Sequence, residues 1–358
     1  MDDEGRVVGR TTSLTVRLAR LGFADAARAV ELLEMPAMSA YAAPEILDSF
    51  AEAADPDLAL RSLVRITETH ESGQSIGAAD RLHALARSDR LLRSRLFAVL
   101  GSSEALGDHL VRHPEHVSVL AEPDAIDRRP SRDELRADLL RAVGAGEVAS
   151  EGPVARGYDT DVLDALRVAY RRHLLALAAR DLVGGAQLDD VAGELADLAD
   201  GVLSAALAIA RAEVGDESTT CRLAVIGMGK CGGRELNYVS DVDVIFVAAP
   251  AASSTGDGSI DEADALAVAT RLASSLMRTC STPTGEGSIW EVDANLRPEG
   301  KSGALVRTLA SHLSYYERWA STWEYQALLK ARPSAGDVEL GKEYIEAVLP
   351  FVWGCRRS

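Results

Sequence analysis

Apolar residues recur at helical spacing through most of the first half of the chain. Residues 88–101 begin with Ser and Asp, repeat apolar positions one turn apart and end at a glycine, which is typical of an amphipathic helix with its cap and its stop. Residues 131–144 open with Ser131 and Glu134, the spacing of a capping box. The pattern predicts a front part built almost entirely from helices.

A loop and two longer helices follow this front part. Residues 144–158 are rich in glycine and contain a proline, which favours a loop and a domain boundary. Apolar residues then repeat at spacings of three and four in two stretches, which end at the glycines 184–185 and at Gly215. We therefore predict a helical N-terminal domain over residues 1–150, and a second domain over 151–358 that opens with the two long helices.

The periodicity changes after the second long helix. Residues 221–227 and 241–247 are short apolar runs, which predict buried strands. Residues 289–297 alternate between apolar and polar positions and predict a third strand. Helical spacing returns over residues 262–280 and 308–330. The order of these elements predicts an α+β fold that is mostly helical and has a small mixed sheet.

Composition narrows the classes of function. The chain has 358 residues, 47% of them hydrophobic and 26% charged, which is enough for two domains with their own cores. A formal net charge of −17 repels phosphates and argues against nucleic acid as a partner. No run of about 18 apolar residues occurs, so we expect no membrane span. The four cysteines show no CxxC spacing, and the N-terminus is polar, which favours a cytoplasmic location.

The stretch 227–247, GMGKCGGRELNYVSDVDVIFV, has two interpretations. Gly227, Gly229 and Gly232 match the G-x-G-x-x-G of a dinucleotide-binding loop after a strand. That interpretation requires a helical crossover to a parallel strand, and only RELNYVS separates the last glycine from Asp241. A crossover needs about a dozen residues or more. The spacing excludes the dinucleotide loop.

The aspartates of the same stretch indicate a metal site. Asp241 and Asp243 stand two positions apart, so in a strand they project from the same face. Two carboxylates this close repel each other unless a cation lies between them, and hard oxygen ligands favour Mg²⁺ or Mn²⁺. Asp293, in WEVDANLRPEG, is the best candidate for a third ligand. A solvated strand face is the alternative for Asp293, and the nearby DVD motif favours the metal site.

Two further groups of residues are candidates for a binding role. The glycine-rich turn lets backbone N–H groups approach a phosphate, and Lys230 and Arg234 supply positive charge there. His109, His113 and His116 form H-x₃-H-x₂-H. Pro114 interrupts the helix that would align them, so we expect a structural role and not a metal site.

The motifs together resemble a known family. GMGKCGGRELNYVSDVDVIFV is similar to the nucleotidyltransferase signature of the bifunctional glutamine synthetase adenylyltransferase/adenylyl-removing enzymes. EVDANLRPEGKSGALV resembles the strand that carries that family's third carboxylate. WEYQALLKARPSAGD resembles a helix ending in a Lys and an Arg, and ALGDHLVRHPEH resembles part of the helical front. Cys231 departs from the family, which more often has an apolar residue there. The resemblance implies a DNA polymerase β-like nucleotidyltransferase core preceded by a helical domain.

The resemblance also implies an activity. The chain looks like the N-terminal, adenylyl-removing part of such an enzyme, ending before the family's domain ends. That part removes AMP from a tyrosine of adenylylated glutamine synthetase by phosphorolysis, with inorganic phosphate as co-substrate and ADP as product, and so regulates nitrogen assimilation. A PII-type nitrogen-signalling protein is a further partner that the resemblance suggests. Asp241, Asp243 and Asp293 would be the catalytic metal ligands. The phosphate- and nucleotide-binding residues would be Gly229, Lys230, Gly233, Arg234, Ser240, Arg297, Lys330 and Arg332.

Two alternative functions stay open. The same carboxylates would serve a nucleotidyltransferase of the opposite sense, which adds AMP from ATP to a protein or a small acceptor. A third hypothesis is a regulatory module without activity, whose helical front docks a signalling protein. The intact set of carboxylates argues against that third hypothesis.

Overall fold

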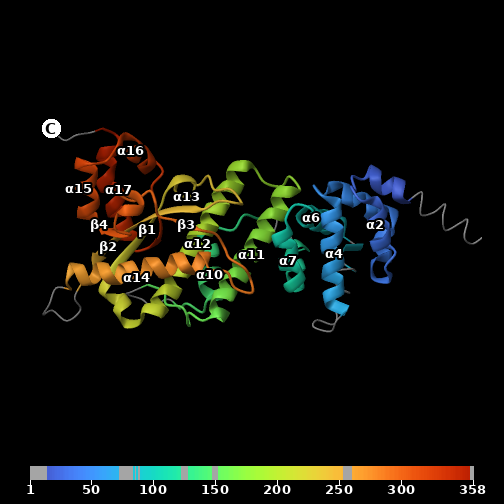
Figure 1. Cartoon of the computed structure of the whole chain (residues 1–358), viewed down its shortest axis with the longest axis horizontal. Coiled ribbons are helices and arrows are strands. Elements are labelled where there is room, and N and C mark those ends of the chain that lie inside the picture. The colour runs from blue at the N-terminus through green and yellow to red at the C-terminus, as the bar shows by residue number, and fades with distance from the viewer. Residues whose placement is uncertain are drawn as a thin grey trace, which may run out of the picture. The chain divides into compact units, whose positions relative to one another are not determined.

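The computed structural model describes residues 14–71, 84, 86, 87, 89–121, 128–146, 152–252 and 260–354. The chain is 66% helical and has a small mixed sheet of five strands (Figure 1). This confirms the predicted α+β, mostly helical fold class.

Contacts divide the chain into two compact units, one of residues 1–129 with 171–187 and one of residues 130–170 with 188–358. This division does not coincide with the predicted boundary after residue 150, because α10 (Arg132–Ala142) packs on α12 (Leu188–Val214) in the second unit. Helix α11 (Thr160–Leu182) contributes its first part to the second unit and its last part to the first. The proposed domain division stays a prediction.

The described residues of the first unit form helices joined by turns, with no strand among them. Phe50 and Phe97 stack in its core with ring centroids 4.1 Å apart. Helix α6 begins after Asp89, which accepts hydrogen bonds from the N–H groups of Leu91 and Leu92, and it ends at Gly101, so the helix predicted over residues 88–101 is confirmed. The elements of this unit are α2 (Ala26–Leu33), η1 (Pro36–Ala42), α3 (Pro44–Leu47), η2 (Asp48–Glu52), α4 (Pro56–Glu71), α6 (Arg90–Leu100), α7 (Glu104–Arg112), η3 (Pro114–His116) and α8 (Val117–Ala121).

The second unit contains the sheet. Its order is β3-β2-β1-β5, with β4 also paired to β2; β1 is antiparallel to β2 and β5, and β3 and β4 run parallel to β2. The strands are β1 (Cys221–Gly227), β2 (Val242–Pro250), β3 (Val292–Asp293), β4 (Val306–Thr308) and β5 (Arg332–Gly336). The first two strands lie where the sequence predicts them.

Helices cover the sheet. Ala224 and Ile226 of β1 pack with Tyr316 and Tyr344, which come from α15 and α17. Helix α14 packs against β1, β2 and β4. The remaining elements of the second unit are α10, α12, η4 (Gly215–Thr220), α13 (Gly229–Gly233), α14 (Glu262–Ser281), η5 (Gly300–Ser302), α15 (Leu309–Arg318), α16 (Thr322–Leu328) and α17 (Val338–Val352). The two predicted long helices, the capping box of Ser131 with Glu134 and the helix predicted over residues 262–280 are confirmed.

Two predicted elements are wrong in extent. The strand predicted over residues 289–297 is formed only by Val292 and Asp293, because the chain then turns around Arg297. That side chain donates to the carbonyls of residues 294, 301 and 303. The helix predicted over residues 308–330 is divided into α15 and α16 by a new capping box of Ser321 with Glu324.

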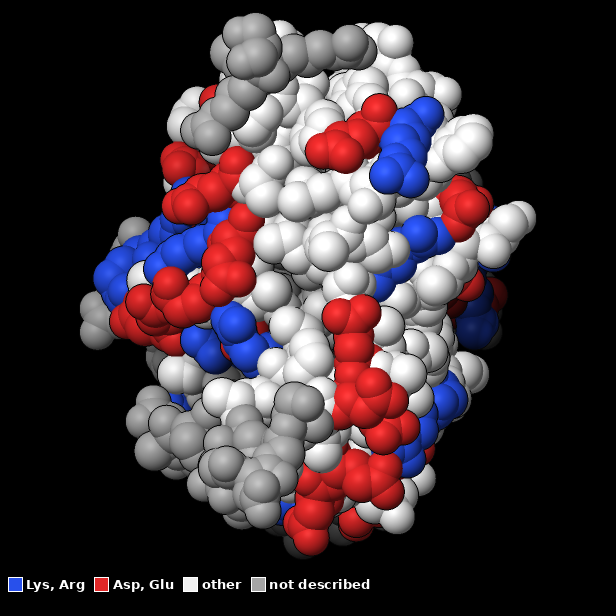
Figure 2. Space-filling view, turned by 90° about the vertical axis from the view of Figure 1, so that its left-hand side faces the viewer, with Lys and Arg blue, Asp and Glu red and all other residues white. Residues whose placement is uncertain are grey.

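On the face shown in Figure 2, Lys and Arg lie beside Asp and Glu and do not gather into one broad basic patch, as far as the described residues extend. Among those residues, none of the helices combines the length and the apolar character needed to cross a membrane.

Candidate active site

Three carboxylates lie at one end of the central strands. Asp243 on β2 and Asp293 on β3 are direct partners in a parallel ladder, and Asp241 immediately precedes β2. Neighbouring strands are about 4.8 Å apart, and paired residues of parallel strands present their side chains to the same face. Asp241 is exposed, whereas Asp243 and Asp293 are half-buried. The structure therefore brings together the aspartates that the sequence singled out.

The carboxylates act on one another electrostatically. Burial, followed by the charges of Asp241 and Asp293, raises the pKa of Asp243, and the ammonium group of Lys230 opposes that rise. In the described part of the chain the three carboxylates do not form a group whose ligand atoms all lie within 4.8 Å of one another. An open, repelling set of oxygen donors suits Mg²⁺, which proteins usually hold through one or two carboxylates together with substrate phosphates.

The turn formed by α13 (Gly229–Gly233), called the glycine turn below, packs directly on Asp243. Gly229 has φ +51°, and a Cβ atom built on it would lie 2.2 Å from Asp243 Oδ2. The N–H of Met228 donates to the carbonyl oxygen of Asp243 over 2.8 Å. A Cβ on Gly232 would lie 2.1 Å from the carbonyl oxygen of Lys330. The G-x-G-x-x-G spacing, which resembles a dinucleotide loop, is explained by these close approaches.

Lys230 and Ser240 border the carboxylates. The Nζ atom of Lys230 lies 3.2 Å from Asn237 Oδ1, its side chain is exposed, and its charge acts on Asp243. Within the described part of the chain, no carboxylate lies within ion-pair distance of Lys230. Ser240 is half-buried next to Asp241.

The other predicted cations have partners in the fold. Arg234 pairs with Asp197, and Arg332 pairs with Asp200. Lys330 Nζ lies 2.5 Å from Glu235 Oε2. Arg297 binds the carbonyls of its own turn; burial lowers its pKa, although the charge of Asp293 opposes this. Gly233 faces the stem of Lys330, whose Cδ would lie 3.0 Å from an added Cβ.

The sequence interpretation missed Asp197 and Asp200. Both lie on α12, where they are 3% and 1% exposed. Along the chain they look like the polar positions of an amphipathic helix. The available signal was their spacing of three residues within the apolar run ELADLADGVL, which places both on one buried face.

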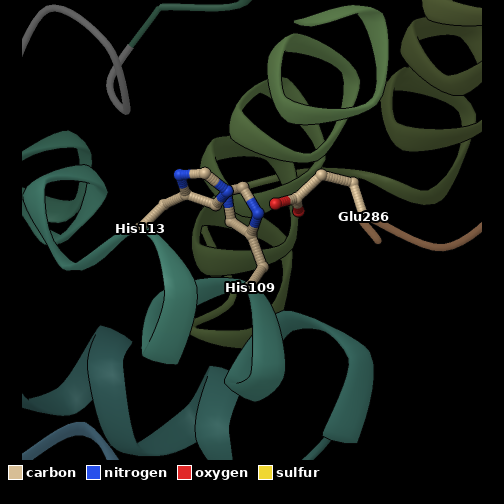
Figure 3. A group of neighbouring side chains, drawn as sticks. All are labelled: His109, His113 and Glu286. Carbon is tan, nitrogen blue, oxygen red and sulfur yellow. The ribbon is translucent and has the colours of Figure 1, made fainter. Parts of the chain in front are cut away.

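The histidines of the first unit do meet. Figure 3 shows His109 and His113 at the end of α7 with their rings side by side, and their centroids are 5.0 Å apart. His109 Nε2 lies 2.9 Å from His116 Nδ1, so one ring donates to the other. Helix α7 ends before Pro114 as the sequence indicates, but the following turn returns His116 to the cluster. Burial lowers the pKa of His109 to about 3, with the charges of His116 and His113 adding to the effect.

Comparisons with known proteins agree on one family. The family model described as glutamate-ammonia ligase adenylyltransferase matches residues 93–347. A protein of Streptomyces avermitilis is 50% identical over 346 residues, which cover 96% of this chain and 32% of the relative. A protein of Nocardia farcinica is 48% identical, covering 94% of this chain and 32% of the relative. Both are named bifunctional glutamine synthetase adenylyltransferase/adenylyl-removing enzyme. The chain spans about a third of the length of these relatives.

Proposed function

Because this chain belongs to the glutamate-ammonia ligase adenylyltransferase family, we propose that it removes the adenylyl group from glutamine synthetase by phosphorolysis. The observation that carries the proposal is the pairing of Asp243 with Asp293 beside Asp241, with the glycine turn packed against it. The direction of the reaction rests on the likeness of RELNYVSDVD to the adenylyl-removing form of the family's motif. The relatives' printed names contain both activities.

The proposed reaction is a phosphoryl-group displacement. An oxygen of inorganic phosphate forms a bond to the phosphorus of the adenylyl group, and the bond from that phosphorus to the tyrosine oxygen breaks. The products are ADP and a free tyrosine, whose oxygen takes the proton that the attacking hydrogen phosphate gives up. Such reactions need little covalent chemistry from the protein, and depend on positioning and on neutralising charge.

The carboxylates have the chemistry of a ligand set for divalent ions. Asp241, Asp243 and Asp293 would hold Mg²⁺ or Mn²⁺, ions that when bound neutralise the charge on the attacking and leaving oxygens. Burial and then repulsion from Asp241 and Asp293 raise the pKa of Asp243, and this supports the assignment because a bound cation would relieve the repulsion. The half-buried position of Asp243 and Asp293 limits the water around the reacting groups.

Lys230 and Ser240 are the proposed phosphate contacts. Lys230 carries its charge next to Asp243, and the partner that the described residues give it is the amide oxygen of Asn237, whose place an anion can take. Ser240 adjoins Asp241 and offers a hydroxyl donor. Gly229 and Gly233 at the two ends of α13 let the backbone come close, as a phosphate cradle requires. Lys330 lies beside the same turn and would add positive potential to it, and Arg297, whose charge acts on Asp293, would do so next to the third carboxylate.

A phosphate-dependent release assay tests the function. The chain is incubated with adenylylated glutamine synthetase, Mg²⁺ or Mn²⁺ and inorganic phosphate, and ADP is measured. We expect ADP only when phosphate is present, and a loss on the order of a hundredfold or more in Asp243→Asn. Asp264→Asn, an exposed change of the same kind on α14, is the matched control and should keep full activity.

Other outcomes decide against the proposal. AMP transfer from ATP onto unmodified glutamine synthetase, without phosphorolysis, would assign the chain to the opposite direction. A folded chain with neither activity would refute both enzymatic assignments. Equal rates in Asp243→Asn and in the wild type would refute the carboxylate site.

A further inference from the structure

Two buried carboxylates of α12 face the glycine turn from outside the carboxylate site. Asp197 and Asp200 stand three residues apart, on the side of α12 that packs against α13 and β5. They are 3% and 1% exposed, so each needs a partner for its charge. Asp197 pairs with Arg234 of the glycine turn, and Asp200 pairs with Arg332 of β5 and with Arg132 of α10.

The first pair holds the end of the glycine turn. Arg234 donates from Nη1 to Asp197 Oδ1 over 2.5 Å and from Nη2 to Asp197 Oδ2 over 2.8 Å, which is a bidentate arrangement. Arg234 is the residue that ends α13, and its backbone is left-handed, with φ +59° and ψ +37°. A residue with a side chain adopts this conformation at a cost in free energy, and the ion pair supplies compensation.

The second pair reaches the carbonyls of the same helix. Arg332 donates to both oxygens of Asp200, over 2.5 and 3.1 Å. The same guanidinium donates to the carbonyl of Cys231 over 3.1 Å and to that of Gly232 over 3.3 Å. Arg132 of α10 adds a further cation, with Nε 2.8 Å from Asp200 Oδ2. The carbonyl of Cys231 also accepts from the N–H of Arg234 over 3.2 Å, and the guanidinium of Arg332 links the carbonyls of Cys231 and Gly232 to Asp200 of α12.

The opposite end of the glycine turn contacts the carboxylate of Asp243. Gly229 begins α13 against Asp243 Oδ2, and Met228 donates to the carbonyl of Asp243. Since α13 has five residues, a displacement of its anchored end moves its other end. We propose that Asp197 and Asp200 are positioning residues, which hold α13 through Arg234 and Arg332 and thereby fix the carboxylate of Asp243 for the reaction.

This inference rests on the proposed function, and it gives Arg234 a different task from phosphate binding. Phosphate binding and pairing with Asp197 both use the two N–H donors of the guanidinium. Loss of activity in an Arg234 variant alone would therefore not distinguish the two roles. The partner carboxylate does distinguish them. Asp197 is essential only if the pair positions the turn, because an anionic residue does not bind phosphate.

The experiment compares four single variants and one double variant. Asp197→Asn and Asp200→Asn keep the shape and remove the charge, and Asp189→Asn, exposed on the first turn of the same helix, is the matched control. Amide hydrogen exchange over residues 228–236 is followed by mass spectrometry, and kcat and KM for phosphate are measured by ADP release. The double variant Asp197→Leu with Arg234→Met replaces the ion pair by apolar side chains of similar size, and is compared with Arg234→Met alone.

We expect faster exchange over residues 228–236 in Asp197→Asn and Asp200→Asn, and a fall in kcat on the order of tenfold to a hundredfold with KM for phosphate unchanged. The control keeps wild-type values. The double variant should be about tenfold more active than Arg234→Met, because no uncompensated buried charge remains in it.

The inference is overturned if the exchange over residues 228–236 is the same in the wild type and both Asn variants. It is also overturned if Arg234→Met and the double variant share one low activity and a raised KM for phosphate, since Arg234 would then bind phosphate itself. If the wild-type chain releases no ADP, the proposed function fails, and the exchange measurement still decides whether the two aspartates hold α13.

Discussion

Gly229→Ala is the substitution whose consequence follows most directly from the geometry of the site. The new Cβ would lie 2.2 Å from Oδ2, 3.0 Å from Cγ and 3.4 Å from Cβ of Asp243. Rotation of the carboxylate group alone does not relieve the overlap, because Cγ lies on the rotation axis and is itself too close. The side chain of Asp243 must therefore retreat by about 1 Å, a misplacement that costs on the order of a hundredfold in rate.

Gly229→Ala also lowers the free energy of unfolding. Gly229 has φ +51°, and a side chain in the left-handed region costs about 1–2 kcal/mol. Gly215, the first residue of η4, has φ +74° and nothing within 4 Å of an added Cβ, so Gly215→Ala carries the same kind of backbone strain without a collision. The pair separates the effect of strain from the effect of moving the carboxylate.

The assay measures ADP release at saturating phosphate and the free energy of unfolding from urea titration. We expect both variants to lose about 1–2 kcal/mol of stability, and Gly229→Ala alone to lose kcat on the order of a hundredfold. Activity of Gly229→Ala within about threefold of the wild type would refute the reasoning. Equal losses of kcat in the two variants would show that strain, and not contact with Asp243, is the cause.

Three further predictions concern other parts of the chain. Lys230→Gln should raise KM for phosphate about tenfold in the same ADP assay, because a charge-assisted hydrogen bond contributes about 1.5–3 kcal/mol; an unchanged KM would exclude the contact. Burial and then the charges of His116 and His113 lower the pKa of His109 to about 3, so its contribution to stability is complete above pH 6.5 and is lost as the pH falls toward 3. In urea titration, this group should cost about 2 kcal/mol of the free energy of unfolding between pH 6.5 and 5. His109→Gln should flatten that pH dependence, and an unchanged dependence would mean that the pKa of His109 is ordinary. Arg167, fully buried, donates to the carbonyls of residues 163, 279, 282 and 287, and Arg167→Met should lose about 3 kcal/mol or more in the same titration, since these carbonyls lose a charged donor in a buried site. A loss below about 1 kcal/mol would contradict this.

Elements with local signals were predictable from the sequence. The capping box of Ser131 and Glu134 marks the start of α10, and Gly101 marks the end of α6, because these signals act within a few residues. The prediction of a strand at the DVD motif likewise placed Asp243 on β2, and Asp241 immediately precedes that strand. The pairing of Asp243 with Asp293 agrees with the position expected for a third carboxylate, and its catalytic role stays a proposal.

Elements that depend on distant or competing contacts were not predictable. The alternating pattern of residues 289–297 favours a strand, and the side chain of Arg297 instead binds three carbonyls of a turn that follows Asp293. The apolar stripe of residues 308–330 runs on across the break between α15 and α16. The spacing of apolar residues does not indicate that Ser321 and Glu324 cap a new helix there.

The cations of the glycine turn show why residue type alone does not assign a binding role. A guanidinium binds a phosphate and a carboxylate with the same fork, so Arg234 and Arg332 have the same appearance in the sequence under either role. Their partners are separated from them by 37 and 132 residues, and only the fold brings those carboxylates to them. Lys230 differs because its nearest partner is the amide oxygen of Asn237, seven residues away, which leaves its charge to act on Asp243 and on an incoming anion. On this argument the phosphate site is centred on Lys230, and the two arginines secure the turn that carries it.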